Sequence, residues 1–144
     1  MGLIMAKECT MEQPKLTSLD HLVLTVADID VAVAFYTKVL GMTHTPFKVA
    51  DGSTRHAVAF GTSKINLHKA GAEFDPKADA PTPGSADLCF LSDTPLAVWQ
   101  DHLSAHNVTI EEGPVPRSGA QGPILSLYLR DPDGNLIEVS TPRP

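Results

Sequence analysis

Imidazole and carboxylate side chains occur beside the apolar segments of this chain, at positions from which a fold can direct them to one site. They are His21, His68, Asp87 and Glu138, and the amide of Asn66 precedes the second histidine by two residues. Neutral imidazole and carboxylate together suit a divalent transition metal. Buried together without a metal, such a cluster would carry a desolvation cost. The residue types therefore predict a metal site if the fold brings them together.

Strand periodicity predicts that these side chains share one face. The segment 19–26 is β-rich, and its alternation directs His21 away from the apolar Leu22, Leu24 and Val26. The same alternation in strands 64–68, 87–91 and 135–140 directs a polar set away from the packing face: Asn66, His68, Asp87 and Glu138. We therefore expect one curved surface that carries all five polar side chains.

The elements that must position these residues occur twice. In each half, a helix N-cap follows the polar residue at the strand start by seven positions, and a helix stop follows it by twenty. These pairs are Asp28 and Gly41 after His21, and Thr94 and Asn107 after Asp87. The repeat predicts two strand–helix–strand–strand–strand units of about 50 residues that share one core.

Turn signals divide the chain further. Residues 1–17 are predicted to form a flexible tail and residues 18–144 a single domain. Within that domain we expect module one at about 18–69, a linker at 70–85 and module two at about 86–141. Smaller features are Asp51–Gly52 as a hairpin turn, 56–60 as a strand, 112–116 as a turn, 124–129 as a strand and 131–134 as a tight turn.

Composition excludes several classes of protein. The 144 residues carry a formal net charge of −6, which argues against a nucleic-acid partner. The apolar stretches are far shorter than the roughly 20 residues that cross a membrane, so no membrane association is expected. Cys9 and Cys89 do not form a disulfide framework. We read both as free thiols and predict a cytoplasmic location.

Three segments carry a family resemblance that spans roughly residues 17–141. They are Leu19–Val26, Phe35–Met42 and Asp131–Glu138. They resemble the vicinal oxygen chelate superfamily, which includes glyoxalase I, bleomycin- and fosfomycin-resistance proteins and extradiol dioxygenases. The segments 64–68, 83–90 and 112–117 look closest to the short glyoxalase-domain-containing subgroup that includes glyoxalase-like bacterial virulence proteins.

The resemblance implies an α+β fold of two βαβββ modules that pair into an incomplete barrel around a metal. Carried over by position, His21 matches the first-strand histidine of module one, and Glu138 matches the last-strand glutamate of module two. Asn66 stands where glyoxalase I has a glutamate, and Asp87 stands where many members have a histidine. His68 or Asp87 would then complete the metal site, and the metal itself, Zn²⁺, Ni²⁺, Mn²⁺ or Fe²⁺, stays open.

The resemblance also implies a reaction and its alternatives. We expect a metal-dependent lyase or isomerase that acts on a small α-oxygenated molecule, with Glu138 and Asp87 as catalytic carboxylates. Asn66, Tyr128 and Arg117 are candidates for substrate contacts. The alternatives are a non-enzymatic antibiotic-binding protein of bleomycin-resistance type and an extradiol-type dioxygenase. We expect a homodimer, in which the modules pair either within or between chains.

Overall fold

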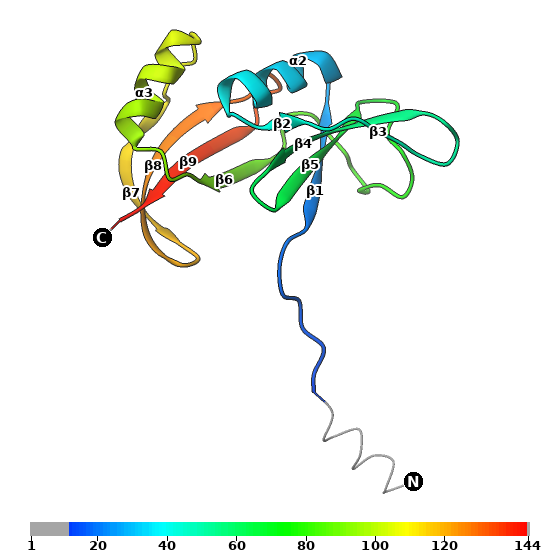
Figure 1. Cartoon of the computed structure of the whole chain (residues 1–144), viewed down its shortest axis with the longest axis horizontal. Helices are drawn as coiled ribbons and strands as arrows, with labels where there is room; N and C mark the ends of the chain where they lie inside the picture. Colours follow the sequence, from blue (N-terminus) through cyan, green and yellow to red (C-terminus); the bar gives the residue numbers. More distant parts are fainter. Residues whose placement is uncertain (1–11, 144) are drawn as a thin grey trace, which may run out of the picture.

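The computed structural model describes residues 12–143, which form two units of similar design (Figure 1). The first unit contains β1 (His21–Val26), α2 (Ile29–Ala34), the π-helical turn η1 (Phe35–Val39), β2 (Thr43–His44), β3 (Phe47–Lys48), β4 (Thr54–Phe60) and β5 (Ser63–Lys69). The second contains β6 (Asp87–Leu91), α3 (Leu96–Ala105), β7 (Glu112–Gly119), β8 (Gly122–Arg130) and β9 (Leu136–Pro142). The predicted duplication of a βαβββ unit is therefore confirmed.

Each unit builds its own sheet. The first sheet has the order β1-β5-β4-β2, with β3 also paired to β4. The second has the order β6-β9-β8-β7. In both sheets the first strand lies parallel to the last strand of its unit, and the other pairs are antiparallel. The sheets do not close into a barrel, so the α+β fold with an open, incomplete barrel is as expected.

Both helices lie on the same side of the two sheets (Figure 1), and one continuous core joins them. Leu24 and Ile65 from the first sheet and Leu127 and Ile137 from the second belong to this core together with Leu103 of α3. Full burial of an aliphatic side chain of this size stabilises a fold by about 1.5–3 kcal/mol. The opposite face of each sheet, which no helix of residues 12–143 covers, is called its open face below.

A buried hydrogen-bond network fixes the first unit against the second. The Tyr36 hydroxyl of η1 donates to Asp131 Oδ2 at 2.6 Å, and Asn135 Nδ2 donates to the same oxygen at 2.7 Å. Asn135 Oδ1 in turn accepts from the backbone N–H of Ala86. Burial, followed by the hydrogen bond to Asp131, raises the pKa of Tyr36 far above its usual range, so its hydroxyl stays a donor.

Several local predictions hold. Asp28 caps α2 by accepting from the backbone N–H of Val31 at 3.0 Å. Gly41 follows the helical segment with a φ of 75°, a conformation that glycine adopts without steric cost. The strand 87–91 has the predicted bounds, and the hydrogen bond from Gly134 to Asp131 closes the predicted tight turn.

Two predictions are wrong. The segment 112–116, expected to turn the chain, begins β7. Its two prolines are tolerated because β7 is the edge strand of its sheet, where a missing N–H breaks no ladder. Thr94 is not the N-cap of α3. Pro95 holds that position, and no side chain caps the helix.

The remaining described segments are irregular. Residues 12–20 contain no helix or strand, and residues 1–11, which include Cys9, lie outside the described residues. The chain from 70 to 86 connects the two sheets without a strand or helix. No helix within residues 12–143 is long and apolar enough to cross a membrane.

Candidate functional site

The open face of the first sheet carries the polar residues of β1 and β5. Parallel pairing places His21 beside Lys64, Val23 beside Asn66 and Thr25 beside His68. The intervening residues, such as Leu24 and Ile65, face the core. Strand alternation therefore brings His21, Asn66 and His68 onto one surface, as the sequence predicted.

His21 is oriented by its chain neighbour. Its Nδ1 atom lies 2.8 Å from Asp20 Oδ2, and 43% of its side chain is exposed. A carboxylate that accepts from one imidazole nitrogen fixes the tautomer and leaves the other nitrogen as a lone-pair donor. Histidines that ligate metals commonly have such a carboxylate partner.

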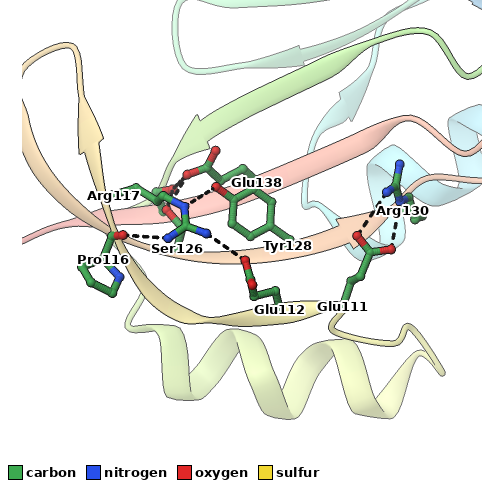
Figure 2. Close-up of polar contacts among 9 residues, drawn as sticks. Glu111, Glu112, Pro116, Arg117, Ser126, Tyr128, Arg130 and Glu138 are labelled. Atoms are coloured by element: carbon green, nitrogen blue, oxygen red, sulfur yellow. Dashed lines mark hydrogen bonds and ion pairs between the residues drawn. The ribbon is translucent and has the colours of Figure 1, made fainter.

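Glu138 stands on the open face of the second sheet, held by serines from two strands. The Ser126 hydroxyl of β8 donates to Glu138 Oε2 at 2.6 Å, as Figure 2 shows. Ser140, two residues along β9, lies 2.6 Å from Ser126 Oγ and 3.4 Å from the same glutamate oxygen. The serines fix one carboxylate oxygen and leave Oε1 without a hydrogen-bond partner among the described residues.

Cys89 and Asp87 of β6 extend this face. Cys89 is the register partner of Glu138, and its Sγ lies 3.3 Å from Ser140 Oγ. Desolvation raises the pKa of Cys89, so the thiol form prevails near neutral pH. Asp87 is exposed at the start of the strand, beside Leu136.

A cavity of about 510 Å³ opens beside Glu138. Tyr128 and Arg117 line it together with Cys89 and the β7–β8 turn. Arg117 donates to the Tyr128 hydroxyl at 2.9 Å and forms an ion pair with Glu112 at 2.8 Å (Figure 2). The bond to Tyr128 raises the pKa of Arg117, which keeps its positive charge. The structure thus places Glu138, Tyr128 and Arg117 around one cavity.

His68 lines a different cavity. This second space, of about 360 Å³, lies between the β1–β5 end of the first sheet and residues 76–86. His68 is buried, and its ring stands edge-on to Phe74 at 5.3 Å between centroids. Desolvation, reinforced by the charge of Arg55, lowers the pKa of His68 and favours the neutral ring.

The residues proposed to hold a metal do not converge within one chain. No group of three histidine, cysteine, aspartate or glutamate side chains within residues 12–143 is arranged to hold a metal ion. The imidazole of His21 and the carboxylate of Glu138 are nevertheless suitable metal ligands. Asp20 orients His21 on the first sheet, and Ser126 orients Glu138 on the second. Each sheet therefore presents part of a ligand set on its open face.

Sequence reasoning passed over two polar residues of these faces. Cys89 follows Asp87 by two positions, so strand alternation alone would have put it on the same face. Arg55 gave no such signal, because its place depends on the register of β4 against β5 and on Phe74 in the connection.

Comparison with known proteins agrees with the fold. Residues 18–139 match the Glyoxalase/Bleomycin resistance protein/Dioxygenase superfamily. The chain is 49% identical to "Glyoxalase domain-containing protein RDO1" of Mycosarcoma maydis over 141 residues, which cover 98% of this chain and 77% of that protein. It is 52% identical over 122 residues to "Virulence protein STM3117" of Salmonella typhimurium strain LT2, with 85% and 82% covered.

A solved structure agrees closely with the architecture. Integron cassette protein VCH_CASS1, from the mobile metagenome of V. cholerae, aligns with a TM-score of 0.85 and 55% identity. The alignment covers 92% of this chain and all of that one. The chain belongs to the Glyoxalase/Bleomycin resistance protein/Dioxygenase superfamily.

Proposed function

We propose that the protein is a homodimeric, metal-dependent lyase or isomerase of glyoxalase type that acts on a small molecule with neighbouring oxygens. The observation that carries the proposal is the orientation of His21 and Glu138 by neighbouring side chains. His21 Nδ1 is held by Asp20 and Glu138 Oε2 by Ser126. The second nitrogen of His21 and the second oxygen of Glu138 are thereby available to a ligand.

A second copy of the chain supplies the missing half of each site. Within one copy the shared core buries the helix faces of both sheets. No helix of the described residues covers the open faces, and the connection between the sheets covers only the His68 end of the first one. Apolar side chains stand exposed on these faces, including Val23 at 46% and Leu91 at 54%. A two-fold pairing that sets the first sheet of one copy against the second sheet of the other covers both faces and unites His21 with Glu138.

The residues have distinct tasks in this arrangement. His21 and Glu138 hold the metal, with His68 or Asp87 as the further candidate ligand. A bound divalent metal supplies Lewis-acid polarisation of a ligand oxygen. Asp87, when it is not a ligand, accepts a proton from the carbon beside the substrate carbonyl. Tyr128, Arg117 and Asn66 orient the substrate oxygens, and Ser126 holds Glu138 in place.

The proposed location is the cytoplasm, because the Cys89 side chain is a free thiol.

Metal content tests the proposal. The purified protein, without an affinity tag, is expected to retain about one equivalent of Zn²⁺, Ni²⁺, Mn²⁺ or Fe²⁺ per chain and to melt at a higher temperature with it. His21→Ala and Glu138→Gln are expected to lose both properties. His106→Ala, at the exposed C-cap of α3, and Asp30→Asn, on an exposed position of α2, serve as matched controls and retain them.

The activity assay follows on the metal-loaded protein. Turnover of α-ketoaldehydes or 2-hydroxy acids, lost in Asp87→Asn, supports the lyase or isomerase. Oxygen consumption with a catechol would identify a dioxygenase instead. A protein with no metal and no melting shift on adding any of the four ions would contradict the proposal and leave an antibiotic-binding protein on the same fold.

A further inference from the structure

Arg55 of β4 is a cationic side chain that has no anionic partner within residues 12–143. Val58 belongs to the core, so alternation places Ala57 and Arg55 on the open face of the first sheet. The buried Nε of Arg55 has no hydrogen-bond partner among the described residues, and Arg55 takes part in none of their ion pairs. A buried guanidinium nitrogen left without an acceptor is unfavourable, so the position favours an external anion.

The surroundings hold Arg55 in place without neutralising it. Its guanidinium carbon lies 3.7 Å from the centroid of the Phe74 ring. The same Phe74 ring also stands edge-on to the ring of His68. Asp51 is near enough to respond to the arginine charge, but its carboxylate accepts from Ser53 instead. Two other arginines do have anionic partners, since Arg117 pairs with Glu112 and Arg130 with Glu111.

A second unsatisfied atom lies on the same face. Asn66 Oδ1 is buried and has no donor among the described residues. Asn66 pairs with Ala57, which places it diagonally across the ladder from Arg55. Diagonal neighbours lie about 7–8 Å apart, within reach of one small ligand. The face therefore offers a planar cation beside an unpaired amide oxygen, which an O–H or N–H donor can satisfy.

We propose that this face binds a small 2-hydroxy carboxylate. The carboxylate accepts hydrogen bonds from Arg55, and the neighbouring hydroxyl donates to Asn66 Oδ1. The inference rests on the proposed function for the chemistry that follows binding, and it names the substrate class of that site. The binding itself needs only residues of the first sheet and no metal.

Three probes separate the two contacts. Glycolate has both groups, acetate lacks the hydroxyl, and methyl glycolate lacks the charge. In nuclear magnetic resonance titrations of the full chain, glycolate is expected to shift the Arg55 Nε–Hε signal and to bind about fivefold more tightly than acetate. Methyl glycolate is expected to leave that signal unmoved. An Arg55 signal that glycolate does not move would overturn the proposal without any variant.

Variants assign the contacts. Arg55→Met is expected to weaken glycolate binding by at least about tenfold, because charge-assisted hydrogen bonds are lost. Asn66→Leu is expected to abolish the preference for glycolate over acetate. Lys48→Met, which removes an exposed cation of the neighbouring strand β3, is the control and leaves binding unchanged. If Arg55→Met does not fold, Arg55→Lys keeps the charge without the planar fork and is expected to weaken binding too.

The same titration on metal-free His21→Ala separates this inference from the proposed function. Retained glycolate binding supports the Arg55 site even if the metal proposal fails. Binding that is unaltered by both Arg55→Met and Asn66→Leu would refute the Arg55 site even if metal is present.

Discussion

Asp20 and Ser126 each orient one candidate metal ligand, His21 and Glu138 respectively, through a single side-chain contact. Asp20 lies next to His21 in the chain, so its 2.8 Å contact depends on no distant packing. Ser126 reaches Glu138 across a strand pair, which requires the β8–β9 register. Both contacts restrict the orientation of a ligand before any metal arrives, and this restriction lowers the ordering cost of binding.

The role of Asp20 leads to a first prediction. Asp20→Asn is expected to weaken metal binding by about 10–100-fold while the fold is retained, because the amide no longer fixes the His21 ring as a carboxylate does. Metal affinity measured by competition with a chelator checks this. Asp30→Asn, the same change on the exposed side of α2, is the control. Equal affinity in the two variants would remove Asp20 from the site.

His68 predicts a pH dependence of stability. Desolvation and the charge of Arg55 lower its folded-state pKa below the ordinary 6.5. The unfolded chain then binds more protons, so this contribution to stability is complete above about pH 6.5 and is lost as the pH falls below it. Denaturant unfolding at about pH 7.5 and about pH 5.5 is expected to show a smaller loss on acidification in His68→Gln than in the unmodified chain.

The control for this pH effect is His106→Gln at the exposed C-cap of α3. It should reproduce the pH dependence of the unmodified chain. If His68→Gln reproduced it as well, His68 would not be the group responsible.

At the level of elements, a joint between η1 and the β8–β9 turn links the two units. Tyr36, Asp131 and Asn135 satisfy one another in the buried interior, and the adjacent Ala86 N–H is bound to the same network. The joint therefore links β6, η1 and the β8–β9 turn through buried polar groups that lie outside the candidate site.

Tyr36→Phe tests that joint. Without the Tyr36 hydroxyl, the buried carboxylate of Asp131 loses one of its hydrogen-bond donors. We therefore expect a decrease of about 1–3 kcal/mol in the free energy of unfolding. Denaturant titration measures it. Tyr128→Phe removes a hydroxyl from the partly exposed open face and is expected to cost less than about 0.5 kcal/mol. Equal losses in the two variants would mean that the joint does not hold the units together.

The repeated elements could be predicted from the sequence because the signals that mark them are local. The Asp28 cap, the Gly41 stop and the alternation in 87–91 each depend on a few adjacent residues. The strands β2 and β3 have two residues each, too few for any periodicity, and β7 is marked by prolines that only an edge strand tolerates.

The candidate site was predicted in part for the same reason. Alternation predicts that His21 and His68 share a face, but not that His68 turns to a separate cavity under residues 76–86. The ion pair of Arg117 with Glu112 depends on contacts between strands. The stacking of Arg55 on Phe74, without an ionic partner in the described part of the chain, depends on the long connection between the sheets. No local pattern in the sequence reports such contacts.

At the level of the whole molecule, the two open faces and the divided ligand set point to a shared explanation. One copy buries its helix faces in a common core and leaves His21 and Glu138 on separate sheets. Two copies in a two-fold arrangement would contain two identical sites, each with His21 from one chain and Glu138 from the other. Dimerisation would then be a requirement of metal binding rather than an accessory to it.

The decisive measurement is the metal content of a mixed dimer. His21→Ala and Glu138→Gln chains are co-expressed with different tags, and the heterodimer is isolated by sequential capture, removal of the tags and repurification. If the site is shared between chains, one of its two sites pairs both intact residues, and the heterodimer is expected to hold about one metal per dimer while each mutant homodimer holds none. A heterodimer without metal, beside an unmodified protein that binds it, would show that the site forms within one chain and would contradict the shared arrangement.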